Sequence, residues 1–408
     1  MNKFFKTAFI LSVLLPFSAN ADMFELTLTQ NSNSVTKGFK SVTDIFDKYK
    51  NGELNTILAG YDPTQNATGK LDFRGIEMRL NYTANKLQFV VPSIGVDQTF
   101  GDGTSQTEAF NDFKNYLEKN KDGLLSKILK ESVTNTPFDA VAGTPSSLMG
   151  QMADAAFFNP VLDSASRILV SGTNDGTFVA APHATVHRLT GTDKKKKSSA
   201  AVALPLGYAY KFDNDWAIAV DVPLTYIDTD GSSAYAVQAG LSVQIPLYKD
   251  KWTVTAAGRA GATASSDMLS GGILYMGSAT SNLSFDLTGT TRLTITNMYA
   301  RVQDYKAKTG DFEIDYDLRN NVLKNGAAIR QTIGTDYALT VFGYNTKYTG
   351  SKLYIDEYNE GGFRLTKFLS GKTAVAGWDV MFSAAKGDNY EAFRAAVSLL
   401  FCPFENGG

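Results

Sequence analysis

The second half of this chain is built from segments in which large apolar residues alternate with small or polar ones, each about ten residues long. Tight turns and longer polar loops separate these segments in alternation. Segments of this kind are the signature of strands in a transmembrane β-barrel. A barrel can cross a bilayer with polar residues at every second position because those residues face an enclosed lumen. We therefore expect a membrane all-β fold here.

One segment illustrates the alternation and the aromatic residues that accompany it. Its large apolar residues are Trp216, Ile218, Val220, Val222 and Leu224, and the residues between them are Ala217, Ala219, Asp221, Pro223 and Thr225. Aromatic residues stand beside the turns, as Phe212 and Trp216 do at one turn and Tyr248 and Trp252 at the next. Such positions suit the aromatic girdles of a membrane interface. We expect the apolar face to contact lipid.

The spacing of the turns predicts the number of strands. Turns near Asn214, Asp250, Gly289, Gly334 and Gly371 recur at intervals of roughly 36 to 45 residues, enough for two strands and one loop. The loops are expected at Lys194–Lys197, Asp228–Ser233, Ser265–Asp267, Lys306–Asn325, Thr349–Asn359 and Lys386–Asn389. These connections join twelve antiparallel strands within residues 178–401. An even number of strands puts both ends of the barrel on the same side of the membrane. Short turns of such barrels face the periplasm, so we expect both ends to be periplasmic.

The N-terminus indicates export. Residues 1–21 contain a basic start, the apolar run Ala8–Phe17 and an Ala-Asn-Ala sequence before Asp22, which is typical of a secretory signal peptide. The apolar run is short for a membrane anchor. The single cysteine, Cys402, excludes an intramolecular disulfide, and the net charge of −2 gives no reason to expect a nucleic-acid partner.

Residues 22–141 differ in composition from the barrel region and predict a small α+β domain. Lys70–Asn81 and Asn85–Val91 are predicted to form a hairpin, and Thr107–Glu131 a helix with a break at Asp122-Gly123. We expect this domain in the periplasm. A plug of the barrel and a secreted passenger remain as alternatives.

Residues 142–177 are predicted to form a helix and a linker. Thr144-Pro145-Ser146-Ser147 offers a helix start, and the small residues that follow predict a slender helix up to Phe158. A slender helix just before the first strand can sit inside a lumen of twelve-strand width. It can equally cap the periplasmic mouth or pack on the preceding domain.

A short helix, twelve strands and a last strand ending in the aromatic Phe401 resemble the translocator domain of autotransporters and solitary barrels of that type. The resemblance covers about residues 142–401 and lies in the architecture, since no motif carries it. It implies an outer-membrane barrel of a Gram-negative bacterium with an occupied pore, assembled by the barrel assembly machinery. Residues 402–408 form a tail after Phe401, whereas the usual pattern ends at the aromatic residue.

Candidate lumen-lining residues carry both signs of charge, so strong ion selectivity is not implied; they are Lys211, Asp221, Arg259, Arg330, Asp379 and Arg394. A charge facing lipid would cost about 2–4 kcal/mol, which is why these residues are expected to face inward. His183 and His187 share a face but lack an evident third metal ligand. We expect no metal, no cofactor and no catalytic residue.

The function expected from the sequence is structural, or export or surface display, without enzymatic activity. A small-solute porin is the alternative, and a barrel-embedded hydrolase is the third, disfavoured because no Gly-x-Ser-x-Gly motif is present. Outer-membrane lipid is the expected surrounding. The lysine run Lys194–Lys197 could contact lipopolysaccharide phosphates.

Overall fold

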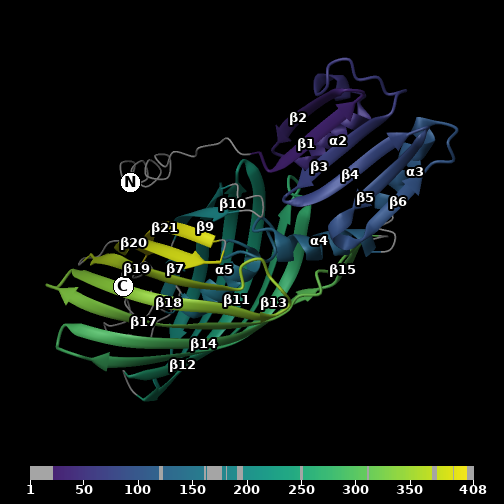
Figure 1. Ribbon diagram of the computed structural model, residues 1–408. Helices are drawn as coiled ribbons and strands as arrows, with labels where there is room; N and C mark the ends of the chain where they lie inside the picture. Colours follow the sequence, from purple (N-terminus) through teal and green to yellow (C-terminus); the bar gives the residue numbers. More distant parts are fainter. Residues whose placement is uncertain are drawn as a thin grey trace, which may run out of the picture.

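An N-terminal α+β domain sits at one end of a C-terminal barrel in the computed structural model (Figure 1). The structure describes residues 22–118, 123–159, 162, 177–180, 182–190, 196–248, 251–309, 312–369, 375–388 and 390–401. The predicted signal peptide and C-terminal tail lie outside these residues. Across the described part of the chain, no helix has both the length and the apolar character needed to cross a bilayer.

The N-terminal domain is an antiparallel sheet covered by helices. The strand order is β2-β1-β3-β4-β5-β6. The strands are β1 (Phe24–Gln30), β2 (Asn33–Phe39), β3 (Ala67–Phe73), β4 (Ile76–Thr83), β5 (Lys86–Val91) and β6 (Val96–Phe100). The helices are α2 (Val42–Lys50), α3 (Gln106–Glu118) and α4 (Leu124–Asn135), with short 3-10 turns η1 (Leu54–Thr56) and η2 (Pro92–Ile94). Phe113 of α3 packs on Phe89 of β5 with ring centroids 5.2 Å apart, which places the helix over the sheet.

Two predictions for this domain need correction. The predicted strand Lys70–Asn81 is itself a hairpin, because Arg74 and Gly75 both have positive φ and turn the chain between β3 and β4. The apolar residues keep a period of two on either side of this turn but are three apart across it, from Phe73 to Ile76. The predicted helix Thr107–Glu131 is two helices, and Gly123 in the left-handed conformation precedes the second.

The barrel contains twelve antiparallel strands, as the turn spacing predicted. The first strand is interrupted into β7 (Thr177–Ala180) and β8 (His183–Thr190), which both pair with β9. The others are β9 (Lys196–Lys211), β10 (Ala217–Thr229), β11 (Ser232–Tyr248), β12 (Trp252–Ser265), β13 (Ser270–Asp286), β14 (Thr291–Tyr305), β17 (Arg319–Ile333), β18 (Tyr337–Gly350), β19 (Glu357–Phe368), β20 (Val375–Gly387) and β21 (Tyr390–Phe401). Pairing of β21 with β8 closes the barrel.

The predicted turns at Asn214, Gly289 and Gly334 fall between strands, and those at Asp250 and Gly371 lie outside the described residues. Several predicted loops are shorter than expected. The predicted loop Thr349–Asn359 covers only residues 351–356, and Lys196 and Lys197 of the predicted loop Lys194–Lys197 already belong to β9.

The connection at Asp228–Ser233 is a tight turn in which Asp230 and Gly231 both have positive φ, as a type I′ hairpin requires. The connection predicted at Lys306–Asn325 ends at Leu318, because β17 begins at Arg319. It holds the small hairpin of β15 (Ala307–Thr309) and β16 (Phe312–Ile314) and is the longest connection of the barrel.

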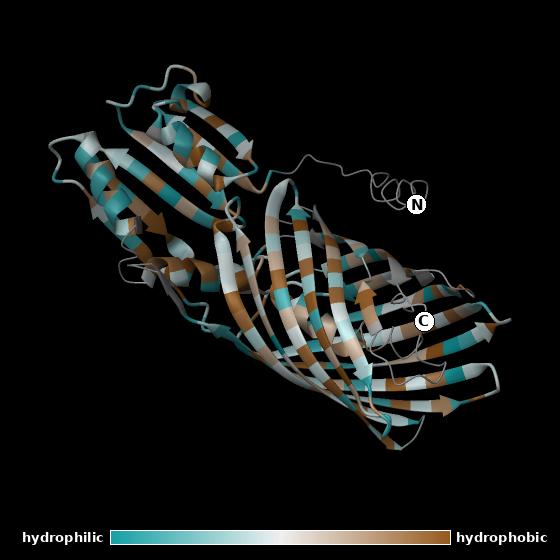
Figure 2. Ribbon diagram, turned by 180° about the vertical axis from the view of Figure 1, so that it is seen from behind, coloured by the Kyte–Doolittle hydropathy of each residue, from teal (hydrophilic) through white to brown (hydrophobic). Residues whose placement is uncertain are grey.

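The side chains of the barrel alternate as predicted, with the large apolar residues outside. In β10, Val220, Val222 and Leu224 are almost half exposed, whereas Asp221 and Thr225 are buried. Figure 2 shows hydrophobic and hydrophilic residues alternating along the barrel strands. The aromatic residues beside the turns, Phe212, Trp216, Tyr248 and Trp252, are also exposed. An apolar outer band with aromatic edges identifies a transmembrane barrel.

Leu241→Arg is expected to destabilise the barrel in a membrane by about 2–4 kcal/mol, because it puts a charge against lipid near the middle of β11. Leu247→Arg is the matched control, since Leu247 lies on the same strand and face beside the turn. Its expected cost is below about 1 kcal/mol. Urea unfolding from lipid vesicles measures both. Equal costs would contradict the orientation of this face towards lipid.

Candidate functional site: a helix inside the barrel lumen

The helix α5 (Leu148–Phe158) begins with a cap that the sequence encodes. The Ser147 hydroxyl accepts a hydrogen bond from the Gly150 backbone N–H at 3.4 Å. A Cβ on Gly150 would lie only 2.4 Å from the Pro145 carbonyl oxygen, so a glycine is required for this tight entry. Small residues such as Ala153 and Ala156 keep the helix slender, and both are fully or almost fully buried.

The helix runs through the barrel from the domain end towards the other end. Near its start, Leu148 packs against Gly261 of β12. Near its end, the Asn159 amide donates to the Ser242 hydroxyl of β11 at 3.0 Å. Leu162 then packs in a buried apolar cluster with Val179 of β7, Ala209 of β9 and Ala219 of β10. The described part of the chain therefore runs along the lumen from Leu148 to Leu162, which packs beside the first strand.

Asp154 ties the helix to two separate parts of the barrel wall. Its carboxylate lies 2.5 Å from Lys324 Nζ on β17 and 3.0 Å from Arg394 Nη1 on β21. Arg394 also lies 3.3 Å from Glu360, whose other carboxylate oxygen accepts from the Ser383 hydroxyl at 2.6 Å. Two acids thus face two bases, and the cluster is formally neutral. A buried charge is tolerated when it is paired in this way.

Aromatic rings complete the setting of Lys324. Its ammonium lies 5.1 Å from the ring centroid of Phe157 and 4.9 Å from that of Phe158, both at the end of α5. Tyr344 of β18 packs edge-on against the same two rings. The Lys324 side chain has no solvent exposure. The end of the helix is therefore held by charge and by aromatic packing together.

A second ion pair holds the helix from another side of the lumen. Arg259 of β12 bonds both carboxylate oxygens of Asp221 of β10, at 2.7 and 2.8 Å. The same guanidinium donates to the backbone carbonyl of Ala155 at 3.2 Å. Gly240 lies between the two strands, and a Cβ there would collide with both charged side chains. The glycine therefore provides the space that this pair needs.

The six candidate lumen-lining residues do not form one cluster. Asp221, Arg259 and Arg394 contact α5 or its partners, as described above. Asp379 is buried and lies 3.8 Å from Arg364. Arg330 lies over the ring of Phe368 at 5.5 Å, and Lys211 pairs with Asp215 in the turn.

Sequence reasoning missed the residues that tie the helix most tightly. Asp154 stands in a helix whose partner surface was not known, and Lys324 was assigned to a loop. Glu360 follows directly on a predicted loop. The signal was the alternation along β17, which begins at Arg319. Because the apolar Leu323 faces outward, its neighbour Lys324 must face the lumen.

A small space of about 190 Å³ remains in the lumen beside α5. His183, His187, Arg364, Asp379 and Arg394 are among its lining residues. His187 is buried, with Nδ1 3.4 Å from the Tyr390 hydroxyl. No group of three or more potential metal-binding side chains occurs among the residues that the structure describes.

The N-terminal domain docks on the barrel connections at the end opposite the five predicted short turns. Several hydrogen bonds and an ion pair join the two units. The Ser232 hydroxyl donates to the Lys40 carbonyl, the Val42 N–H to the Asp267 carbonyl at 3.3 Å, and the Tyr354 N–H to the Val133 carbonyl at 2.8 Å. Lys130 pairs with Asp317 at 2.9 Å. The longest connection, between β14 and β17, takes part in this interface.

A buried cluster around Asp139 lies at the centre of this interface. Its carboxylate contacts Arg74 of the domain at 3.2 Å, Ser132 of α4 at 3.3 Å and Ser270 of the barrel at 3.1 Å. Ser270 lies in turn 3.2 Å from the hydroxyl of Tyr316. Arg74 and Asp139 have no side-chain exposure. The Asp139 carboxylate thus connects Arg74 and α4 of the domain to Ser270 of the barrel.

No protein-family profile and no curated protein matches the sequence. Among solved structures, the chain is similar to the translocator domain of the autotransporter NalP from Neisseria meningitidis, with 12% identity over 62% of this chain and 97% of that chain and a TM-score of 0.47. It is similar to an outer-membrane channel from Pseudomonas putida F1, with 12% identity over 56% and 96% of the two chains and a TM-score of 0.42. The KdgM porin gives 10% identity over 54% and 99%, with a TM-score of 0.33. Matches at this level do not distinguish a translocator from a channel.

Proposed function

We propose that this protein is a bacterial outer-membrane barrel that displays its own N-terminal domain at the cell surface, with α5 as an internal tether. The path of α5 carries this proposal, because the helix leads from the docked domain through the lumen to the first strand. Short turns of outer-membrane barrels face the periplasm and longer loops face outward. The domain docks on the side with the longest connection.

This proposal reverses our expectation of a periplasmic domain and agrees with the passenger alternative. The resemblance to solitary autotransporter barrels supports the same role. Contacts with lipopolysaccharide and with the barrel assembly machinery remain predictions. We propose no catalytic role, and a barrel-embedded hydrolase is the least favoured alternative.

An epitope tag inserted at the exposed Asn51-Gly52 turn of the domain is expected to bind antibody on intact cells. The same tag inserted at Asn214, in the β9–β10 turn, is the control and is expected to react only after the outer membrane is permeabilised. Labelling of intact cells by flow cytometry measures both. The opposite pattern would show a periplasmic domain and refute surface display.

A small-solute channel is the second candidate, and the space of about 190 Å³ beside α5 favours it. The charged side chains that line this space, Arg364, Asp379 and Arg394, suit small polar solutes. Helix α5 narrows any path for solutes through the lumen. A large conductance of the intact protein in planar bilayers would favour the channel over a tethered, occluded barrel.

A further inference from the structure

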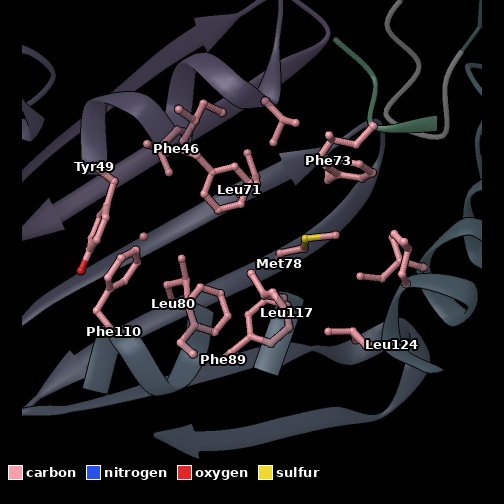
Figure 3. A pocket seen from close by; sticks show the side chains of 18 of the residues that line it. Phe46, Tyr49, Leu71, Phe73, Met78, Leu80, Phe89, Phe110, Leu117 and Leu124 are labelled. Atoms are coloured by element: carbon pink, nitrogen blue, oxygen red, sulfur yellow. The ribbon is translucent and has the colours of Figure 1, made fainter. Parts of the chain in front are cut away.

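A large apolar cavity lies within the N-terminal domain, between one face of the sheet and the helices (Figure 3). Its volume is about 660 Å³, and small-molecule sites typically measure about 300–1,000 Å³. Figure 3 shows side chains converging on it from α2, β3, β4, β5, α3 and α4; those labelled are Phe46, Tyr49, Leu71, Phe73, Met78, Leu80, Phe89, Phe110, Leu117 and Leu124. No residue of α5 lines this cavity.

The lining carries no charge. Of the described residues that form its wall, none is Asp, Glu, Lys, Arg or His. The polar side chains among them are the phenols of Tyr49, Tyr61 and Tyr82 and a few barrel serines. Burial raises the pKa of Tyr49, so its hydroxyl stays neutral at physiological pH. A charged group inside this cavity would find no counter-charge.

The cavity extends from the side of α2 and α3 in the domain to the rim of the barrel. The rings of Tyr49 and Phe110, with centroids 4.3 Å apart, join α2 to α3 at one end. Residues of the β12–β13 connection, including Leu269, and Ile314 of β16 contribute to its wall. Phe46 and Leu269 are 38% and 41% exposed, so the way to solvent is itself apolar.

Physical chemistry argues against an empty or water-filled cavity of this kind. Water finds few hydrogen-bond partners on an apolar wall, so an apolar group displaces it favourably. An unfilled cavity destabilises a protein in proportion to its volume. An apolar occupant would restore the lost contacts and stabilise the domain by binding.

We propose that this cavity binds the acyl chain of a single-chain amphiphile. A long, uncharged cavity with an apolar way out suits a hydrocarbon chain, and its position beside the barrel rim lies near the lipid that supplies such chains. The head group would remain at the mouth, near the exposed Ser266. A free fatty acid and a lysophospholipid share this chemistry. The proposal does not depend on which side of the membrane the domain occupies.

The test uses the full chain reconstituted in phospholipid nanodiscs and dansyl-undecanoic acid as a fluorescent probe. We expect saturable binding with a blue shift of the dansyl emission, and displacement by a competing acyl chain. Displacement by palmitate but not by lysophosphatidylethanolamine identifies a fatty-acid site, and the reverse identifies a lysophospholipid site. Absence of saturable binding, or no displacement by either competitor, would overturn the proposal.

Gly69→Phe should weaken probe binding at least about tenfold, because the ring would fill the cavity. Gly69 tolerates a side chain, since the atoms nearest to an added Cβ are 3.8 Å away. Thr68→Phe is the matched control, as Thr68 is exposed on the opposite face of β3, and its binding should be unchanged. Equal binding by the two variants would refute the assignment of the site.

Limited proteolysis shows whether the domain of Gly69→Phe is folded. Should it unfold, Ala67→Leu provides the second variant, because Ala67 lines the same cavity and the added volume is smaller. We expect Ala67→Leu to weaken probe binding less than Gly69→Phe does, but measurably compared with Thr68→Phe. Unchanged binding by a folded Ala67→Leu variant would also count against the proposal.

Discussion

Asp154→Ala is expected to release helix α5 from the barrel wall and to raise the conductance of the protein sharply. The substitution removes the carboxylate that lies between Lys324 and Arg394. Arg394 keeps Glu360, but the fully buried Lys324 loses its ion-pair partner. Breaking a buried pair by removing one partner costs about 3–5 kcal/mol, because an uncompensated charge remains. The barrel should therefore become less stable as well as more open.

Planar-bilayer recordings and urea unfolding measure the two effects separately. Gln151→Ala is the control on the same helix, since Gln151 is neutral and meets the wall through a 3.4 Å hydrogen bond with Gln238. Its other hydrogen bond, to the Ser146 carbonyl at 2.8 Å, is local to the start of α5. Both its conductance and its stability should stay close to those of the parent protein. Adding Lys324→Met to Asp154→Ala removes the unpaired charge, so it should restore much of the stability while leaving the helix untied. That combination separates the electrostatic penalty from the loss of the tether.

Unchanged conductance in Asp154→Ala would show that packing alone holds the helix in the lumen. Leu148, Met149 and Met152 are almost fully buried and could provide such packing. A parent protein that already conducts strongly would contradict an occluded lumen. Only this second outcome would favour a channel over a tethered barrel.

The barrel could be predicted from the sequence because its pattern is local. Each strand must show lipid an apolar face, and a shift by one residue would turn Asp221 or Arg259 outward. The Asp230-Gly231 turn is equally local, since these two residues supply the positive φ values of a type I′ hairpin, although the loop predicted there was longer. Strand number and side-chain orientation therefore follow from windows of ten to twenty residues, roughly the span of one strand and its turn.

The tether and the docked domain could not be predicted because they depend on distant partners. Asp154 meets Lys324 and Arg394 across sequence separations of 170 and 240 residues. The sequence showed a slender helix but not the direction in which it crosses the lumen. It also predicted neither the strands β1, β2 and β6 nor helix α2, although these build much of the sheet and the apolar cavity.

Asp139→Ala is expected to loosen the N-terminal domain from the barrel while leaving the barrel folded. The buried Arg74 would lose its carboxylate, and Ser132 and Ser270 would lose the group that connects them. The expected cost is about 3–5 kcal/mol. It falls on the domain and on its contact with Ser270, because Arg74 and Ser132 belong to the domain and the barrel strands pair without Asp139. Limited proteolysis of the reconstituted protein should cut between the domain and α5 much faster than in the parent. Heat-modifiable gel mobility should still report an intact barrel.

Asp317→Ala is the matched control, since it removes the ion pair with Lys130 across the same interface. Both partners of that pair are 56% exposed, so the expected cost is at most about 1 kcal/mol. Asp139→Asn should fall between the two, because the amide keeps an acceptor for Ser132 and Ser270 but removes the charge opposite Arg74. If all three variants resist proteolysis equally, the domain is held by its backbone bonds to the barrel connections, such as the one from Tyr354 to Val133, and not by the Asp139 cluster. A graded loss in the order Asp317→Ala, Asp139→Asn, Asp139→Ala would instead identify the buried charge as the group that fixes the domain over the lumen.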